Sequence, residues 1–371
     1  MFNKSNINFD KEFYDESISK NTKLLIINNQ INETYFYNFL SKYLSKNKKR
    51  IIGFDIEFNT PPGSHNERVI AIFQIAFYFK KYVLVIFFNP LALGCMPERQ
   101  DIPLLINNKT NKLIIKLLTS QNIYKIGHGT DSLDVPAIYN YLNNKDDIIA
   151  FTNTLYDTRF LCEFTNVITG ERLCNIYHLI DKYKVVKSEQ MEWLKVNEKK
   201  LGDFWKKKID INNLSPELRD YSMYDALYLK KLIILMKKDF TKSNYDFNLI
   251  IQATRLVFLL KREIIKLDDY SYLNICFLSN KKKLYDYFNE VFLKFNQDIL
   301  KIGYFKNQLI KILQLVFYIQ ICKKNPVYKS SNTLIDKTDI DKLEIIWNKF
   351  NVYLKFFPKI NKLINNFLYK L

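Results

Sequence analysis

Asp55 and Glu57 lie two residues apart in the run IIGFDIEF, residues 51–58. Residues i and i+2 of a β-strand point to the same face, so the two carboxylates would project side by side. Neighbouring negative charges among Ile, Phe and Gly residues are costly unless a cation neutralises them. Carboxylate oxygens are preferred ligands of Mg²⁺ and Mn²⁺, so the pair is a candidate divalent-metal site. Taken alone, the pair fits a strand end that faces water equally well.

A second pair, Tyr221 and Asp225, lies in the segment YSMYDALYL, residues 221–229. A spacing of four residues is about one helical turn, so on a helix both side chains share a face. Leu227 and Leu229 predict that this helix packs against the core. One buried face would then carry a phenol and a carboxylate, although an isolated pair of this kind is more often a core Tyr with an exposed Asp.

The third candidate segment is KIGHGTDSLDVPAIY, residues 125–139, which joins a predicted strand to a predicted helix. Gly127 and Gly129 mark the end of the strand, and Asp131 and Asp134 lie where the helix begins. Acidic residues are common at helix N-termini as caps and as partners of the helix dipole. Asp131 fits that role, whereas Asp134, within the first turns of the helix, could face a site.

The elements that must position these residues follow from the hydrophobic pattern. Short connections between the strand-like runs up to residue 88 predict antiparallel neighbours, and strands alternate with helices afterwards. This order predicts an α/β fold with a mixed sheet flanked by helices. We expect strands at 24–27, 51–58, 69–79, 82–88 and 124–126, and helices at 33–44, 111–119, from about 132, 154–164, 173–183 and 215–236.

In order and separation, the three motifs resemble those of the DEDDy 3′–5′ exonucleases, and most of all the ribonuclease D-like branch that includes the Werner-type exonuclease domain. The strand VIAIFQIAFY with Gln74 is similar to the second strand of that family, and LYDTRFLCEF is similar to its Asp-Thr-initiated helix. Gln190 and Trp193 resemble its approach to the third motif. The resemblance spans about residues 22–240 and implies a ribonuclease H-like fold.

One motif departs from the family pattern. The family usually has His-Gly-x-x-x-Asp, with the acid five positions after the residue that matches His128, but position 133 of this chain is Leu133. The apolar residues that follow Asp134 match those that follow the family's Asp. A one-residue insertion would explain this match and favours Asp134 as the acid, with Asp131 as the alternative.

Carried onto this chain, the resemblance implies phosphodiester hydrolysis with two Mg²⁺ ions, or with Mn²⁺ in their place. Asp55, Glu57 and Asp225 would hold one ion, and Asp55 would bridge to a second ion, to which Asp134 would contribute directly or through water. Tyr221 would orient the attacking water or help to deprotonate it. The implied substrates are 3′ ends of single-stranded RNA or DNA, and the products are nucleoside 5′-monophosphates.

The alternative is a catalytically silent exonuclease fold that binds nucleic acid or serves as a scaffold. This alternative would hold if neither Asp134 nor Asp131 reached the metals. The sequence does not distinguish RNA from DNA as the substrate.

Composition divides the chain into a polar leader (1–21), the exonuclease-like region (22–240) and a basic region (241–371). The net charge of +18 favours an anionic partner such as nucleic acid. An AT-rich genome would also enrich Lys without selection for binding. Residues 241–371 hold 22 Lys+Arg and 11 Asp+Glu, and long helical patterns predict a mostly α-helical C-terminal domain. Its role is not assigned by the sequence.

The N-terminal segment MFNKSNINFDKEFYDES lacks the apolar stretch of a secretory signal. No uninterrupted apolar run reaches the ~18 residues of a membrane-spanning helix. Five scattered Cys residues without CxxC spacing predict reduced thiols. We therefore expect an intracellular protein, cytoplasmic or nuclear, with no membrane partner. The composition is typical of an AT-rich genome such as that of a virus or a protist.

Overall fold

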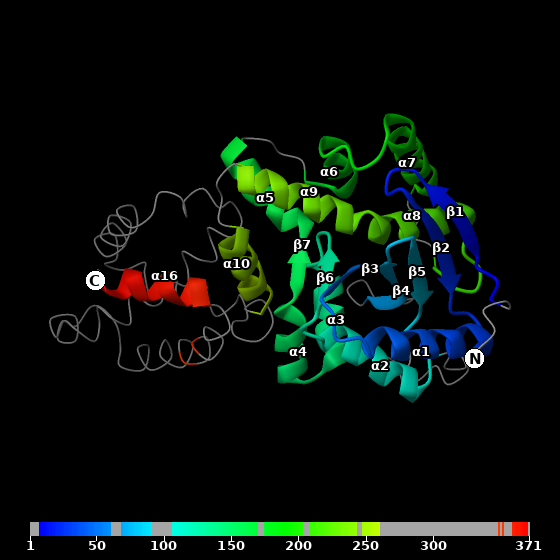
Figure 1. The fold of residues 1–371 in the computed structure, drawn as a ribbon, viewed down its shortest axis with the longest axis horizontal. Helices are drawn as coiled ribbons and strands as arrows, with labels where there is room; N and C mark the ends of the chain where they lie inside the picture. The colour runs from blue at the N-terminus through cyan, green and yellow to red at the C-terminus, as the bar shows by residue number, and fades with distance from the viewer. Residues whose placement is uncertain are drawn as a thin grey trace. The chain divides into compact units, whose positions relative to one another are not determined.

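The computed structural model describes residues 7–60, 68–90, 106–169, 174–202, 208–242, 247–259, 348, 351 and 358–369 (Figure 1). Contacts within the chain divide it into two compact units. The first unit comprises residues 1–159 and 174–243, and the second comprises 160–173 and 244–371.

A seven-stranded mixed sheet forms the centre of the first unit, with the order β1-β2-β5-β4-β3-β6-β7. β4 runs antiparallel to both of its neighbours, β3 and β5, whereas β6 is parallel to β3 and β7 is parallel to β6. The predicted ribonuclease H-like mixed sheet flanked by helices is thereby confirmed. The strands are β1 (Lys11–Asp15), β2 (Lys20–Ile26), β3 (Arg50–Asn59), β4 (Val69–Tyr78), β5 (Tyr82–Phe88), β6 (Ile123–Gly127) and β7 (Leu155–Asp157).

Helices cover both faces of this sheet. Figure 1 shows α8 and α9 on one side and α1 and α2 on the other, and α8 contacts β3, β4 and β5. Local signals fix the start of α8, where the Ser215 hydroxyl accepts a hydrogen bond from the Leu218 N–H (3.2 Å) and Pro216 occupies the first turn. The helices of this unit are α1 (Gln30–Leu44), α2 (Asn108–Thr119), α3 (Asp134–Leu142), α4 (Lys145–Thr152), α6 (Ile176–Lys182), α7 (Ser188–Leu201), α8 (Pro216–Leu227) and α9 (Leu229–Lys242).

The two faces of the sheet differ in character because side chains alternate along each strand. On the face under α1, Phe73 stacks on Phe88 with ring centroids 5.1 Å apart, and Phe39 meets Phe77 edge to face at 4.9 Å. Phe73, Phe77 and Phe88 are buried and Phe39 is half-buried, and this aromatic layer contributes apolar area that stabilises the sheet. The opposite face carries the acidic residues of β3 beneath α8. Aromatic packing therefore stabilises one face of the sheet, and the other face carries the acidic residues that could bind a metal.

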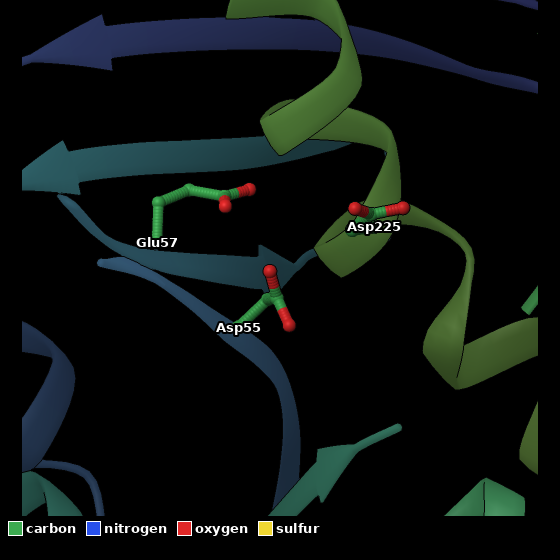
Figure 2. A group of neighbouring side chains, drawn as sticks. All are labelled: Asp55, Glu57 and Asp225. Carbon is green, nitrogen blue, oxygen red and sulfur yellow. The ribbon is translucent and has the colours of Figure 1, made fainter. Parts of the chain in front are cut away.

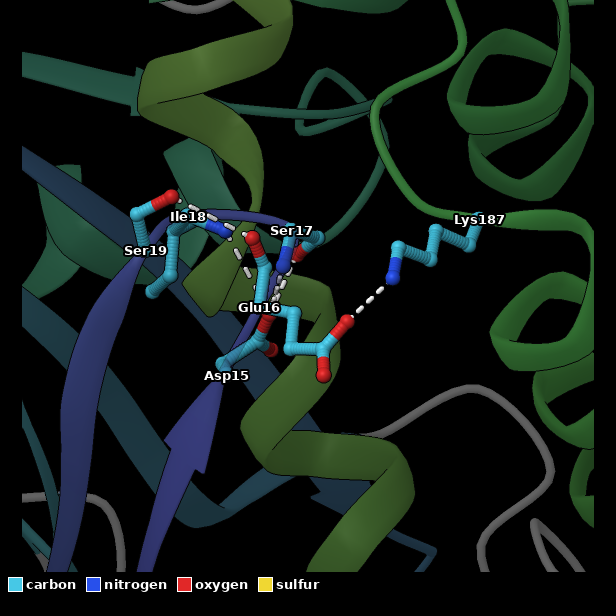
Figure 3. Close-up of polar contacts among 6 residues, drawn as sticks. All are labelled: Asp15, Glu16, Ser17, Ile18, Ser19 and Lys187. Carbon is cyan, nitrogen blue, oxygen red and sulfur yellow. Dashed lines mark hydrogen bonds and ion pairs between the residues drawn. The ribbon is translucent and has the colours of Figure 1, made fainter.

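The N-terminal residues form a hairpin, so the prediction of a polar leader over residues 1–21 is wrong for most of that range. β1 pairs antiparallel with β2. Figure 3 shows the turn, in which the Asp15 carboxylate accepts hydrogen bonds from the Ser17 N–H (2.8 Å) and hydroxyl, while Glu16 pairs with Lys187. Asp15 also accepts a hydrogen bond from the Tyr228 hydroxyl (2.8 Å), and contacts of this kind order a polar segment that has little apolar surface of its own.

Three further expectations need correction. Residues 155–157 form β7, which pairs with β6, rather than the first turn of a helix, and α5 (Thr158–Thr169) begins directly afterwards. The long helix expected over 215–236 is interrupted at Tyr228 into α8 and α9. Cys162 and Cys174 are disulfide-bonded, so the expectation of reduced thiols is wrong for these two residues.

The second unit is helical wherever the structure describes it. Its elements are most of α5, together with α10 (Phe247–Leu259) and α16 (Pro358–Tyr369). Phe160 contacts Phe258 edge to face at 5.2 Å, and the Lys359 N–H donates to the Gln252 side chain at 3.0 Å. The rest of the predicted helical domain lies outside the described residues. Within the part of the chain that is described, no helix combines the length and apolar character needed to cross a membrane.

Candidate metal centre

Three of the predicted site residues converge on one point of the sheet. Asp55, Glu57 and Asp225 each offer a carboxylate oxygen, and these oxygens all lie within 4.8 Å of one another. Figure 2 shows Asp55 and Glu57 projecting from β3 toward Asp225 on α8. Glu57 and Asp225 are buried, with exposed fractions of 8% and 9%, whereas Asp55 retains some exposure. The predicted same-face arrangement on β3 is present.

Gly53 explains how α8 comes so close to β3. It lies on the same face as Asp55, one strand repeat earlier, and a Cβ atom placed there would lie 2.4 Å from the Ala226 carbonyl oxygen. The Tyr78 hydroxyl donates a hydrogen bond to that same oxygen at 2.7 Å. Any side chain larger than hydrogen at Gly53 would force the helix away, so this glycine sets the distance between the Asp225 backbone and the strand.

Neighbouring polar groups orient the Glu57 carboxylate. Its Oε1 accepts hydrogen bonds from the Ser222 hydroxyl at 3.2 Å and from the Gln74 side-chain amide at 3.5 Å. Gln74 pairs with Asp55 in the register of β3 and β4, which brings its amide to this face of the sheet. Glu57 is thereby held from α8 and from β4 together.

Asp134 reaches the same cluster from α3, of which it is the first residue. It is buried, with 8% of its surface exposed, and its charge is the largest electrostatic influence on the Asp55 pKa. Asp131 lies three residues earlier, in the turn between β6 and α3, and Leu133 is 40% exposed. Of the two acids that the sequence left open, Asp134 is the buried one whose charge acts on Asp55, although it is not among the three acids whose oxygens lie within 4.8 Å of one another.

A side-chain clamp shapes the turn that leads to Asp134. The fully buried Asp157 carboxylate accepts hydrogen bonds from the N–H groups of Gly129 (3.1 Å) and Thr130 (2.8 Å), and from the Thr130 hydroxyl (2.8 Å). The Val135 N–H then donates to the Thr130 carbonyl at 2.9 Å, closing a turn one residue wider than an α-helical turn. This wider turn accommodates a one-residue insertion.

Burial raises the pKa of every acid in the cluster, and neighbouring negative charges raise those of Asp55, Asp134 and Asp225 further. The pKa of Asp55 is well above its usual range because of burial and the charges of Asp134, Glu57 and Asp225. Burial raises the pKa of Glu57 to about 7, although hydrogen bonds from Ser222 and Gln74 oppose the rise. The pKa of Asp134 rises to about 8, chiefly by burial, and that of Asp225 rises by burial and the Glu57 charge.

These carboxylates fit a divalent cation. Asp134 Oδ1 and Asp225 Oδ1 are buried and have no hydrogen-bond partner within the described residues. Orphaned buried oxygens are costly, and a hard cation with oxygen ligands would satisfy them while cancelling the repulsion. Asp55, Glu57, Asp134 and Asp225 are the residues that could hold such a cation.

Tyr221 lies one helical turn before Asp225 and forms a hydrogen bond with its carboxylate, which lowers the Asp225 pKa. The Asp225 charge and burial together raise the pKa of the Tyr221 phenol well above its usual range, so the hydroxyl keeps its proton. The sequence therefore predicted correctly that these two residues share a face.

His128 has a structural position. Its Nδ1 lies 2.9 Å from the Thr158 hydroxyl, which in turn donates to the Gly127 carbonyl at 3.2 Å. Burial lowers the pKa of His128 to about 4 despite the nearby Asp157 charge, so the ring stays neutral.

Three residues near the cluster were missed at the level of sequence: Ser222, Tyr177 and Glu198. Ser222 follows Tyr221 directly, and its contact with Glu57 depends on a strand 165 residues away. Tyr177 and Glu198 come from α6 and α7, and both are near enough for electrostatic interaction with Asp225. With 25 Tyr residues in the chain, no local signal distinguishes Tyr177.

No protein-family model matches the chain. It is similar to an uncharacterized protein of Acanthamoeba polyphaga mimivirus, with 28% identity over 368 residues that cover 86% of this chain and 68% of that protein.

Similar solved structures include the Aedes aegypti Nibbler EXO domain, with 15% identity, coverage of 62% of this chain and 94% of that one, and a TM-score of 0.38. Another is the catalytic core of RRP6 from Trypanosoma brucei, with 13% identity, coverage of 93% and 84%, and a TM-score of 0.43. A third is Brucella melitensis NrnC bound to pGG, with 14% identity, coverage of 58% and 83%, and a TM-score of 0.36. The fold assignment rests on the strand order of this chain.

Proposed function

We propose that this protein is a metal-dependent 3′–5′ exonuclease of the DEDDy type that degrades single-stranded RNA or DNA from the 3′ end. The observation that carries the proposal is the convergence of Asp55, Glu57 and Asp225 within 4.8 Å on the buried face of the sheet. The electrostatic influence of buried Asp134 on Asp55 supports Asp134 as the fourth acid of the site.

In this proposal Asp55, Glu57 and Asp225 would hold one divalent ion, and Asp134 would help Asp55 to hold a second. Two bound Mg²⁺ or Mn²⁺ ions would stabilise the attacking and leaving oxygens of an in-line displacement at the 3′-terminal phosphodiester. The chain itself supplies the geometry, because the Gly53 contact fixes α8 against β3 and the Asp157 clamp fixes Asp134.

Tyr221 would orient the attacking water. Its protonated hydroxyl interacts with Asp225, and its remaining lone pair can accept a hydrogen bond from a water molecule between the acids and the substrate. Release of a nucleoside 5′-monophosphate follows from attack at the phosphorus atom with departure of the 3′ oxygen of the preceding nucleotide.

Charge supports a nucleic-acid substrate. The chain carries a net charge of +18, and counterion release would make binding fall steeply with salt. We assign the chemistry to residues 22–240 and leave the basic region 241–371 without a defined role. Similarity to a mimivirus protein supports a viral origin.

Degradation of 5′-labelled single-stranded RNA and DNA by the full chain tests this proposal, in Mg²⁺, in Mn²⁺ and in EDTA. We expect a ladder that shortens from the 3′ end, requires the metal, and disappears with Asp55→Ala. Asp146→Asn, which changes an exposed acid at the start of α4, is the matched control and should leave the ladder intact.

Two results would contradict the proposal. A ladder that Asp55→Ala leaves unchanged would show that the activity comes from elsewhere. Metal-independent binding of the oligonucleotides without any ladder would instead favour the catalytically silent binding module.

A further inference from the structure

A second tyrosine, Tyr177, lies beside Tyr221 in the candidate metal centre. It occupies the first turn of α6 and is only 5% exposed. Its ring meets that of Tyr221 edge to face, with centroids 6.4 Å apart and an interplanar angle of 80°. Since α6 is neither β3 nor α8, Tyr177 reaches the centre from an element that carries none of the predicted site residues.

The surroundings of the Tyr177 phenol are strongly acidic. Burial raises its pKa far above the usual range, and the charges of Asp225, Glu198, Glu57 and Asp55 raise it further. The charges of the three convergent carboxylates therefore act on the phenol, which keeps its proton. A protonated phenol next to a cation-binding cluster is a hydrogen-bond donor for an anion held there.

The hydroxyl of Tyr177 makes no hydrogen bond to any residue that the structure describes. Two other buried tyrosines of this unit are paired, since Tyr139 bonds Thr152 (2.7 Å) and Tyr228 donates to Asp15 (2.8 Å), and the half-buried Tyr78 donates to the Ala226 carbonyl (2.7 Å). The Tyr177 side chain is buried but its hydroxyl is not among the fully enclosed polar atoms without a partner, so it can donate to a ligand at the centre.

We propose that the Tyr177 hydroxyl donates a hydrogen bond to a non-bridging oxygen of the substrate phosphate at the metal centre. The inference rests on the proposed nuclease function and extends it by giving each of the two phenols a separate role. Tyr221 is engaged with Asp225, whereas Tyr177 provides its donor to the phosphate. A phosphate oxygen is anionic, and hydrogen bonds to charged acceptors are stronger than those between neutral groups.

Tyr177→Phe tests this proposal because it keeps the ring, and with it the edge contact to Tyr221, and removes only the hydroxyl. Tyr183→Phe is the matched control at the end of the same helix, where the hydroxyl bonds the exposed Asp239 at 3.2 Å. Two quantities are measured on the full chain: kcat/KM on a short single-stranded oligonucleotide, and calorimetric affinity for a nucleoside 5′-monophosphate in Mg²⁺.

We expect Tyr177→Phe to lower both kcat/KM and nucleotide affinity by about 10- to 100-fold, the loss of one hydrogen bond to a charged group. Its affinity for Mg²⁺ alone and its melting temperature should match the wild type, and Tyr183→Phe should match it in every respect. Wild-type nucleotide affinity and kcat/KM in Tyr177→Phe would overturn the inference.

The two measurements separate this inference from the proposed function. A wild-type protein that binds the monophosphate through Tyr177 but hydrolyses nothing would refute the exonuclease and leave the phosphate contact standing. An active wild type with an equally active Tyr177→Phe variant would refute the contact alone. If Tyr177→Leu impaired the enzyme but Tyr177→Phe did not, the ring would act only by packing against Tyr221, and the inference would again fail.

Discussion

The candidate metal centre has two halves that are built in different ways. Asp55, Glu57 and Asp225 form the β3–α8 half, in which regular backbone elements present each side chain and one glycine sets their separation. Asp134 forms the turn half, because its position depends on an irregular turn that the Asp157 carboxylate holds. Backbone approach builds the first half and side-chain hydrogen bonds build the second.

This difference indicates how each half should tolerate change. A strand and a helix have fixed periods, so their side chains point correctly as long as the two backbones stay in contact. A turn has no such period, and its shape follows from the groups that satisfy its N–H donors. The β3–α8 half should therefore be sensitive to added volume, and the turn half to lost acceptors.

The largest expected effect is a pH dependence of the free energy of unfolding, to which acids of both halves contribute. In the folded protein the pKa of Glu57 is about 7 and that of Asp134 about 8, against ordinary values of 4.5 and 3.8. The folded state binds more protons than the unfolded state between these values, so the free energy of unfolding should fall as pH rises from about 4.5 to about 8. The Glu57 shift alone corresponds to roughly 3 kcal/mol.

Chemical denaturation in EDTA across this pH range measures the slope. Asp134→Asn should flatten it, because one buried charge is removed and its repulsion of Asp55 disappears. Asp131→Asn should leave it as in the wild type. Saturating Mg²⁺ should restore the free energy of unfolding at pH 8. If the free energy of unfolding in EDTA did not change with pH, the acids of the two halves would not repel one another in the folded protein.

Gly53→Ala should break the β3–α8 half. The new methyl group would lie 2.4 Å from the Ala226 carbonyl oxygen and 2.6 Å from the Tyr78 hydroxyl, so α8 must move away from β3. We expect a loss of about 3 kcal/mol, the upper part of the range for overpacking, together with weaker metal binding. Gly202→Ala, where a Cβ meets nothing within 4 Å, controls for the residue type, although its positive φ adds some strain.

Urea denaturation and Mg²⁺ titration of the two glycine variants provide the comparison. Metal affinity in Gly53→Ala equal to that of the wild type would show that the close approach of α8 is not what assembles the three acids.

Asp157→Asn should loosen the turn half. The amide that replaces one carboxylate oxygen cannot accept from Gly129 or Thr130, which leaves a buried donor unsatisfied at a cost of about 1–3 kcal/mol. Asp210→Asn is the matched control, because Asp210 also accepts a backbone hydrogen bond in a turn, from Asn212 at 2.9 Å, but in an exposed position.

The readout of this pair is hydrogen exchange of the Thr130 and Val135 amides together with exonuclease rate. Faster exchange and a slower rate in Asp157→Asn, with Asp210→Asn unchanged, would support the clamp. Unchanged exchange in Asp157→Asn would mean that the turn holds its shape without this acceptor.

The same division explains what the sequence could predict. Strands β3, β4 and β5 and the pairs Asp55–Glu57 and Tyr221–Asp225 follow from fixed periods of two and about four residues, which are visible locally. The choice between Asp131 and Asp134 was left open because the clamp at Asp157 comes from a strand 27 residues after Thr130.

Long-range contacts also explain the two main misses. The sequence predicts a polar leader in place of the β1 hairpin because the anchors of the hairpin, Asp15 with Tyr228 and Lys11 with Asp220, link residues more than 200 positions apart. Tyr177 was missed because nothing near it in the sequence indicates that α6 turns its first residues toward β3 and α8. Periodicity predicts regular elements, but it carries no information about which distant side chain satisfies a turn or borders a site.

The smallest expected effect tests the register of the turn. Leu133 occupies the position where the resemblance places an Asp, yet it is 40% exposed, while Asp134 is buried at the cluster. Leu133→Asp alone should therefore change stability by no more than about 0.5 kcal/mol, as is typical of exposed positions, and should leave the exonuclease rate nearly unchanged.

The double variant Leu133→Asp/Asp134→Asn makes the distinction, because it moves the acid to the family spacing while the wider turn from Thr130 to Val135 stays in place. We expect it to be as inactive as Asp134→Asn, since an acid at position 133 would face solvent. Rescue by the double variant would show that the turn can shift by one residue, so that the acid is selected by the metal and not by the clamp. Failure of rescue would instead show that Asp157 sets the register of the turn. Its carboxylate accepts hydrogen bonds from Gly129 and Thr130, and these bonds fix the turn before any metal binds.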